Sequence, residues 1–396
     1  MNYILYDDSI VRNNLLPLTF MRPVAEIRIG ILTVREKWNR YLETETSTLT
    51  EDYLSKKYPV KKEPNNVLIN SSVCPNKKLV ERIKKLKHNQ ALICCDKLIA
   101  MYLKSEDLDM VGGRDSQNIE EIAMDSNPII VNYLYDIFKK NGEAIKEDFD
   151  LITKNRKSQT ISDTNKLIAK ENIFIEEGAK VECAYLNASN GPIYIGQDAE
   201  IMEGSMIRGP LALGEHSIIK MGAKIYGPTT IGKHSKVGGE VNNTVFFGYS
   251  NKAHDGFIGN SVISEWCNIG ADTNNSNLKN TYDNIKLWNY PEKSFVDTNS
   301  VFCGLIMGDH SKTGINTMIN TGTVIGVNCN IYGPGFPRNF IPSFSWGGTS
   351  GFSSYDLKKA FRVAENVYKR RNLEFDDVEK NILTHVYNET LGNSFL

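Results

Sequence analysis

The feature that most constrains this chain is a six-residue period of aliphatic side chains in its second half. The position four residues after each aliphatic is mostly small. The aliphatic positions are Ile195, Ile201, Ile207, Leu213, Ile219, Ile225, Ile231 and Val237. This period matches neither an α-helix nor a two-sided strand, but it is typical of a solenoid of short parallel strands. The sequence therefore predicts triangular coils of about eighteen residues, with three strands in each.

The period is interrupted before it returns at Ile319, Ile325 and Ile331. Counted from Phe247, the spacing passes through Ala253 and reaches Ile258 after five residues instead of six. A polar stretch without the period, "ADTNNSNLKNTYDNIKLWNYPEK", begins at Ala271. Because a long loop that leaves a regular scaffold is usually functional, we expect a site near this interruption.

Patterning divides the chain into four parts. Residues 1–152 alternate apolar runs with helical segments, which indicates an α/β domain. Residues 153–170 are polar and are predicted to be a linker, and residues 171–345 carry the solenoid. Residues 346–396 show helical spacing and predict a helical extension that caps the solenoid or packs on a neighbouring subunit.

Composition excludes several classes of function. The 396 residues carry a net charge of −1, so nothing draws the whole chain to nucleic acid or to an anionic membrane. No apolar window is long enough for a membrane span, and the first residues do not form a signal peptide. The seven cysteines show no disulfide-framework spacing. We therefore expect a soluble, cytoplasmic protein that binds neither nucleic acid nor membrane.

Positive charges concentrate in residues 12–38, around two prolines and directly after a predicted strand. Guanidinium groups bind phosphate in a bidentate manner and a lysine adds a point charge, so Arg12, Arg22 and Lys37 are candidate ligands of a nucleotide or sugar phosphate. Arg28 and Arg35 fit that role too, or else they solvate the exposed face of a helix.

The segment "LPLTFMRPVAEIRIGILTVREKW" resembles the opening signature of sugar nucleotidyltransferases. Followed by a six-residue solenoid, it resembles the family of bifunctional N-acetylglucosamine-1-phosphate uridylyltransferases/glucosamine-1-phosphate acetyltransferases, most closely a Bacteroidetes-type variant. The resemblance implies a nucleotidyltransferase-like α/β domain, a left-handed parallel β-helix and C-terminal helices, assembled as a homotrimer. It also implies acetyl-CoA, a sugar phosphate and a nucleoside triphosphate such as UTP as substrates, with Mg²⁺ for nucleotidyl transfer.

The resemblance also implies roles for individual residues. In "SNKAHDGFIGNSVI" it assigns His254 as the base that deprotonates the sugar amine, and a histidine suits that task because its pKa lies near neutrality. It places Asn268 and Asn277 in the site, with Asn277 or a backbone N–H as donor to the oxyanion. Tyr282 replaces a displaced family tyrosine, and Lys252 supplies charge for the substrate.

The chain departs from the family pattern in its first domain. The usual glycine-rich loop is absent from "LYDDSIVRNN", which places Asp7 and Asp8 where anions would approach. Either of these aspartates, or Asp96, is a candidate Mg²⁺ ligand. Two alternatives therefore stay open: an acyltransferase for another amino sugar with a silent first domain, and a non-catalytic scaffold that binds sugar nucleotides.

Two further histidines, His216 and His234, are eighteen residues apart and so should stack at one corner of successive coils. They are either solvated turn residues or two ligands of a metal site between subunits. A third ligand at suitable spacing is missing from the pattern, which favours the solvated turns.

Overall fold

The computed structural model describes residues 1–94, 96–110 and 119–392. They form two compact units, and each is discontinuous in sequence. The first unit comprises residues 1–15, 22–27 and 32–132, and the second comprises residues 16–21, 28–31 and the chain from Tyr133 onward. The boundary after Asn132 lies before the one expected at residue 152, because the two helices that follow it pack on the solenoid.

The first unit is built on a mixed sheet with strand order β2-β1-β3-β5-β4-β6. Its strands are β1 (Asn2–Tyr6), β2 (Ser47–Leu49), β3 (Asn65–Asn70), β4 (Gln90–Cys94), β5 (Lys97–Lys104) and β6 (Glu120–Ala123). Its helices are α1 (Ser9–Asn14), α2 (Val34–Leu42) and α3 (Lys77–Ile83). The expected α/β organisation is therefore confirmed.

Local capping fixes where the first two helices begin. The Asp8 carboxylate accepts hydrogen bonds from the N–H groups of Ile10 and Val11 at the start of α1. Helix α2 begins with a capping box between Thr33 and Glu36. Thus the segment that replaces a glycine-rich loop is a short helix capped by an aspartate.

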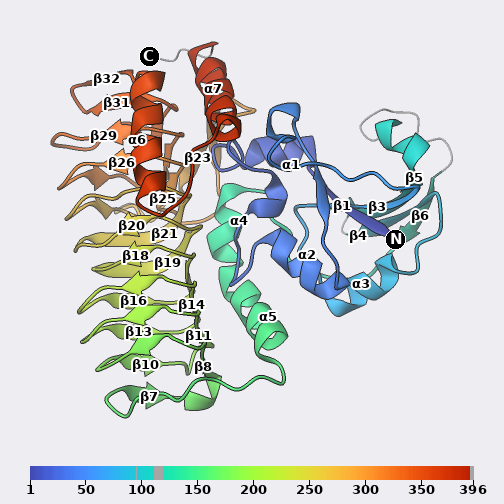
Figure 1. Ribbon diagram of the computed structural model, residues 1–396. Helices are drawn as coiled ribbons and strands as arrows, with labels where there is room; N and C mark the ends of the chain where they lie inside the picture. The colour runs from blue at the N-terminus through green and yellow to red at the C-terminus, as the bar shows by residue number, and fades with distance from the viewer. Residues whose placement is uncertain (95, 111–118, 393–396) are drawn as a thin grey trace. The chain divides into compact units, whose positions relative to one another are not determined.

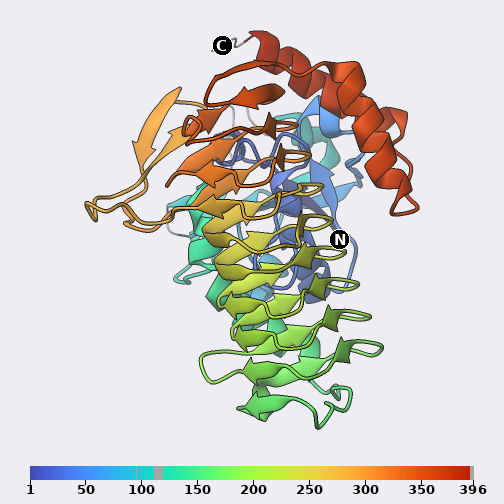
Figure 2. The same ribbon diagram turned by 90° about the vertical axis from the view of Figure 1, so that its left-hand side faces the viewer.

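The second unit is a left-handed parallel β-helix with three faces, stacked in regular coils in Figures 1 and 2. Its first face consists of β9 (Lys180–Val181), β12 (Glu200–Ile201), β15 (Ile218–Ile219), β18 (Lys236–Val237), β20 (Asn251–Lys252), β26 (Lys312–Thr313), β29 (Asn330–Ile331) and β31 (Ser345–Gly348). Its second face consists of β7 (Lys166–Ile168), β10 (Tyr185–Asn187), β13 (Met206–Arg208), β16 (Lys224–Tyr226), the first halves of β19 (Glu240–Phe246) and β21 (Phe257–Ile263), β22 (Asn274–Asn275) and β27 (Met318–Ile319).

The third face completes each coil. It consists of β8 (Ile173–Ile175), β11 (Ile193–Ile195), β14 (Leu211–Leu213), β17 (Thr229–Ile231), the second halves of β19 and β21, β25 (Leu305–Met307), β28 (Thr323–Ile325) and β30 (Phe340–Ile341). A hairpin, β23 (Lys286–Asn289) and β24 (Ser294–Asp297), leaves the stack at the end of the polar stretch that lacks the period. Strand β32 (Gly351–Ser354) pairs with β31 beyond the last coil.

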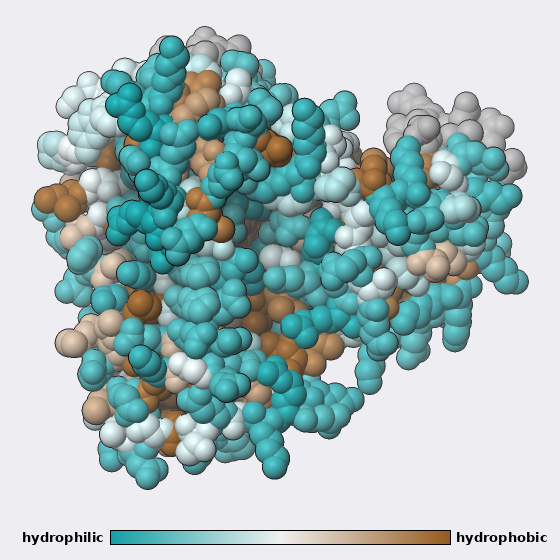
Figure 3. Space-filling view, viewed as in Figure 1, coloured by the Kyte–Doolittle hydropathy of each residue, from teal (hydrophilic) through white to brown (hydrophobic). Residues whose placement is uncertain are grey.

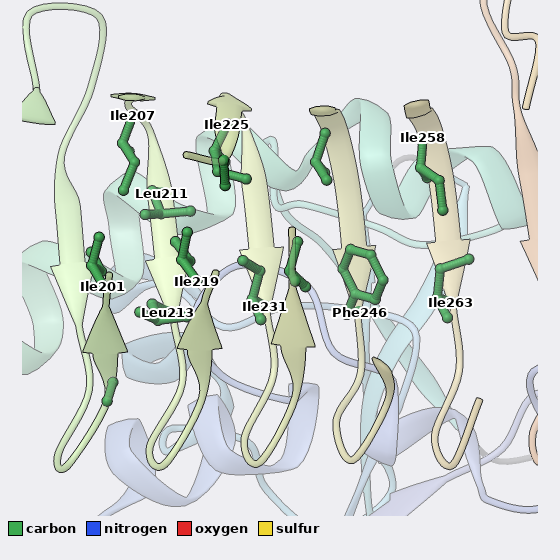
Figure 4. Packing of buried hydrophobic residues seen from close by; sticks show 14 of the residues in the cluster. Ile201, Ile207, Leu211, Leu213, Ile219, Ile225, Ile231, Phe246, Ile258 and Ile263 are labelled. Carbon is green, nitrogen blue, oxygen red and sulfur yellow. The ribbon is translucent and has the colours of Figure 1, made fainter. Parts of the chain in front are cut away.

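The six-residue positions point into the solenoid and form one continuous core, as Figure 4 shows for Ile201, Ile207, Leu213 and Ile219. The prediction that the six-residue period passes through Phe247 and Ala253 was wrong by one residue. The inward positions are Phe246, Lys252 and Ile258, spaced by six, and the five-residue step follows at Ile263. A lysine at an inward position hid the true register.

Helices cover part of the solenoid. Helix α4 (Leu134–Lys139) packs on β19 and β21, and α5 (Asn141–Thr153) packs on β17, so both helices lie against the middle coils. The predicted linker, residues 153–170, begins at the last residue of α5 and contains β7, which pairs with β10 in the solenoid. Helices α6 (Leu357–Lys369) and α7 (Asp377–Gly392) form most of the expected C-terminal extension, but its first residues lie in the strands β31 and β32 instead of a helix.

The surface of the coils mixes hydrophilic and isolated hydrophobic side chains (Figure 3). Among the described residues, every helix is too short or too polar to cross a bilayer.

Candidate functional site

His254 lies at the corner between the first and second faces of the solenoid, between strands β20 and β21. Its side chain is exposed. The corner of the coil below contains only Gly238 and Gly239 between the paired strands, whereas residues 253–256 fill the corner that carries His254. The corner with His254 therefore overhangs a shorter one, and the imidazole is accessible to a substrate.

The glycine pair allows this overhang. A Cβ on Gly239 would lie 2.7 Å from the carbonyl oxygen of Gly256, and Gly239 has a φ of +71°. A Cβ on Gly238 would lie 2.7 Å from the carbonyl oxygen of Ala253. Side chains at either position would push the His254 corner outward, so these glycines set its height above the coil below.

Lys252 points into the solenoid, at a position that is aliphatic in the neighbouring coils. Only 1% of it is exposed, and its Nζ donates a 2.6 Å hydrogen bond to the carbonyl oxygen of His254. Burial lowers the pKa of Lys252 to about 8, against the opposing influence of Asp255 and Asp272. The predicted direct contact of Lys252 with substrate does not fit this inward placement, and the side chain holds the His254 corner instead.

Asn268 lies on the outer surface of the first face, and its side chain is exposed. Its backbone bridges Asn251 in the coil below and Lys312 in the coil above. It therefore precedes the corner of its own coil and lies above the strand that leads to His254.

Asn277 lies at the other end of the second face. Its Nδ2 donates to Oδ1 of Asn260 at 2.7 Å, and its backbone carbonyl accepts from the N–H of Cys303. The strand Phe257–Gly259 separates Asn260 from the His254 corner. At about 3.3 Å per residue, the two corners lie roughly 10 Å apart. The Asn277 side chain reaches back over this strand, because a Cβ on Gly259 would lie 2.6 Å from its Nδ2.

Tyr282 is 71% exposed and lies at a turn with a φ of +57° in the polar stretch that begins at Ala271. Its backbone N–H donates to the carbonyl oxygen of Lys279. An exposed ring at this turn is accessible to a ligand.

The cationic candidates of the first unit are buried, each less than 5% exposed. The Arg12 guanidinium donates to the carbonyl oxygen of Arg22 and to the Tyr53 hydroxyl, and it forms an ion pair with Asp7 at 3.5 Å. Lys37 is also buried, within α2. The predicted role of Arg12, Arg22 and Lys37 as ready phosphate ligands therefore does not fit this arrangement, because at least the Arg12 guanidinium already has partners inside the unit.

Arg28 and Arg35, for which the sequence left two roles open, also have partners within the protein. Arg28 donates to the carbonyl oxygen of Phe247 at 3.0 Å, within the second unit. Arg35 pairs with Glu26 and donates to the carbonyl oxygen of Thr46 at 2.6 Å. Neither is a simple solvated helix residue.

The candidate Mg²⁺ ligands do not converge. Asp7 accepts hydrogen bonds from the Val24 N–H and from the hydroxyls of Thr50 and Ser71, and burial raises its pKa. Asp8 caps α1, and Asp96 is exposed at a turn. No group of three or more His, Cys, Asp or Glu residues suited to a metal occurs in the described parts of the chain. These carboxylates therefore do not fit a preformed Mg²⁺ site.

His216 and His234 stack at the corner between the third and first faces, with ring centroids 4.8 Å apart. The stack continues through Tyr249 to Trp266, whose ring lies 4.1 Å from that of Tyr368 on α6. All four corner residues have a φ between 52° and 63°. This column of rings joins the coils to α6, and the spacing of His216 and His234 was its only visible signal in the sequence.

Comparison with known proteins agrees with the two-part organisation. Residues 3–157 match the family model described as sugar nucleotidyl transferase. A bifunctional sugar-1-phosphate nucleotidylyltransferase/acetyltransferase of Sulfurisphaera tokodaii is 34% identical over 184 residues, which cover 44% of this chain and 43% of the relative. The bifunctional protein GlmU of Methanocaldococcus jannaschii is 32% identical over 23% of this chain and 21% of its own. The chain thus matches less than half the length of these relatives.

Solved structures resemble only part of the chain. The polysialic-acid-specific acetyltransferase NeuO aligns over 49% of this chain and 88% of its own, at 14% identity and a TM-score of 0.26. The UDP-N-acetylglucosamine acyltransferase of Arabidopsis aligns over 59% of this chain and 94% of its own, at 11% identity and a TM-score of 0.22. Because these scores are low, the fold assignment rests on the strand register of the solenoid itself.

Proposed function

We propose that this protein transfers an acetyl group from acetyl-CoA to the amine of an amino-sugar phosphate, and that its first unit transfers a nucleotidyl group from UTP to a sugar 1-phosphate. The exposed His254, held over a glycine corner by Lys252, is the observation that carries the acetyl half. The match of residues 3–157 to the sugar nucleotidyl transferase model supports the nucleotidyl half. The two bifunctional relatives support the combination.

The chemistry asked of His254 is general base catalysis. The unprotonated imidazole takes a proton from the attacking amine while the amine nitrogen bonds to the thioester carbonyl carbon. The C–S bond then breaks, and the CoA thiolate leaves and is protonated. Asn277 Nδ2 is the proposed donor to the oxyanion, although it now binds Asn260 and must exchange that partner for the substrate.

A homotrimer would place a neighbouring subunit beside the His254 corner. Within one chain His254 is exposed at its corner, whereas Gly259 beside Asn277 is buried. In the coils below, Tyr185, Met206 and Tyr226 on the outer surface of the second face are 53%, 57% and 43% exposed. We propose that this face contacts a neighbouring subunit, which would bury these side chains and enclose acetyl-CoA beside His254.

The nucleotidyl half depends on positioning and charge neutralisation. Since Asp7, Asp8 and Asp96 do not form a metal site, the Mg²⁺ expected from the resemblance is assigned to none of them. Arg12 and Asp7 form a buried ion pair directly after β1, so either group would have to exchange its partner before it could bind a substrate.

Two assays separate the proposal from its alternatives. Thiol release from acetyl-CoA with glucosamine 1-phosphate measures the acetyl half, and pyrophosphate release from UTP with N-acetylglucosamine 1-phosphate measures the nucleotidyl half. The proposal predicts both activities in the wild type and loss of only the first in His254→Ala. Thiol release alone would indicate a silent first domain, and neither activity would indicate a scaffold that only binds sugar nucleotides.

A further inference from the structure

The hairpin β23–β24 borders an open pocket of about 720 Å³ beside the last coils of the solenoid. Figure 2 shows the hairpin projecting from the stack, in orange. The pocket is lined by Lys279, Ile285, Lys286, Trp288, Phe295, Thr321, Arg338, Asn339, Phe340 and Pro342. His254 is not among these residues, so the pocket is distinct from the corner that carries the proposed base.

All charged side chains that line this pocket, among the described residues, are positive. Three of its lining residues are cations, and among the described residues that line it there is no carboxylate. Lys286 and Arg338 are exposed, and no hydrogen bond or ion pair of either side chain occurs in the described ranges. Asp297 faces Lys286 across the hairpin, but its carboxylate accepts from the backbone N–H of Asn299. Two cations are therefore available to an anionic ligand.

The walls of the pocket are aromatic. The rings of Trp288 and Phe340 are stacked, with centroids 4.2 Å apart and an angle of 11° between their planes. Phe295 stands nearly perpendicular to Trp288 at 5.4 Å and is 42% exposed. Such a corner of fixed rings offers flat and edge contacts to a planar ligand.

Cations beside aromatic walls suit a ligand that joins a planar ring to phosphate. We propose that this pocket binds a nucleoside phosphate, with its base against Trp288 and Phe295 and its phosphates between Lys286 and Arg338. Two sources share this chemistry: the adenosine 3′,5′-bisphosphate end of CoA, and a free uridine nucleotide. Nucleotide binding in this pocket does not require His254 to act as a base.

Equilibrium dialysis with radiolabelled adenosine 3′,5′-bisphosphate and UTP tests the proposal on the full-length protein. The double variant Lys286→Gln/Arg338→Gln should bind at least one of these nucleotides about tenfold more weakly than the wild type, because it loses two charge-assisted contacts. Lys358→Gln, an exposed lysine on α6 outside the pocket, is the matched control and should bind as the wild type does. Preference for the bisphosphate identifies the CoA source, and preference for UTP identifies the free nucleotide.

Trp288→Phe separates the pocket from other nucleotide sites. It keeps an aromatic wall, so binding by dialysis should persist, whereas the quenching of tryptophan fluorescence by the nucleotide should largely disappear. His254→Ala should bind as the wild type does whether or not acetyl transfer occurs, which separates this proposal from the proposed function. Equal binding by the wild type and the folded double variant would overturn the proposal, and so would the absence of binding of both nucleotides at millimolar concentration.

Discussion

The Nζ of Lys252 donates a 2.6 Å hydrogen bond to the carbonyl oxygen of His254 from inside the solenoid core. The neighbouring coils place Val237 and Ile269 at the same inward position. A buried ammonium among aliphatic side chains costs folding free energy. Its benefit in this structure is that it fixes the backbone of the corner carrying the proposed base.

Lys252→Met should separate stability from activity. Methionine fills the inward position without a charge, so the free energy of unfolding should stay within about 1 kcal/mol of the wild-type value or rise. Acetyl transfer should fall about tenfold or more in kcat, because the His254 corner loses its anchor. Urea denaturation and thiol release measure the two effects, and unchanged kcat in the folded variant would refute the positioning role.

The lowered pKa of Lys252 should make the free energy of unfolding depend on pH. Its folded pKa of about 8 lies below the ordinary value of 10.5, so the unfolded chain binds the proton more tightly. The unfolding free energy of the wild type should therefore rise relative to Lys252→Met as the pH increases from about 8 to 10.5, by roughly 3 kcal/mol at most. Below pH 8 the difference between the two proteins should be flat. A difference that is constant over pH 8 to 10.5 would show that Lys252 is not desolvated in solution.

The glycine beneath the His254 corner should be sensitive to a methyl group. Gly239→Ala brings a Cβ to 2.7 Å from the Gly256 carbonyl oxygen, whereas Gly222→Ala, at a similar φ of +67°, meets nothing within 4 Å. Both variants should lose about 1 to 2 kcal/mol from the left-handed backbone. Only Gly239→Ala should lose more than that and also slow acetyl transfer. Equal stability and activity in the two variants would mean that the corner adapts freely.

The column of rings should contribute strongly to the stability of the second unit. Trp266 is 6% exposed and stacks between Tyr249 and Tyr368. Trp266→Ala should cost about 3 to 5 kcal/mol, as for other buried aromatics. Trp346→Ala, at a residue that is 39% exposed, is the control and should cost clearly less. Thermal denaturation compares the two, and similar losses would contradict a special role for the column.

The coils could be predicted from the sequence because the six-residue spacing of the aliphatic residues identifies the positions that point inward. Prediction failed locally where a polar residue took an inward position, since Lys252 reads as a surface residue and moves the apparent period onto Phe247 and Ala253. The corner before Lys252 has only two residues, Gly238 and Gly239, and this short corner also breaks the six-residue spacing.

The candidate sites were less predictable than the fold. His254 could be found because its motif is continuous in sequence, and its exposure agrees with a site. Arg12 could not be placed, because the sequence does not show that the Arg22 carbonyl oxygen and the Tyr53 hydroxyl would satisfy its guanidinium. The pocket that includes Trp288 and Arg338 joins segments about fifty residues apart, and no local pattern connects them.

The most direct test of the account is the rate of thiol release from acetyl-CoA with glucosamine 1-phosphate, measured for the wild type and for His254→Gln at pH 7.5. The account predicts turnover by the wild type and a loss of about a hundredfold or more in kcat for the variant, as expected when a general base is removed. A variant that turns over as fast as the wild type would contradict the assignment of His254 as the base.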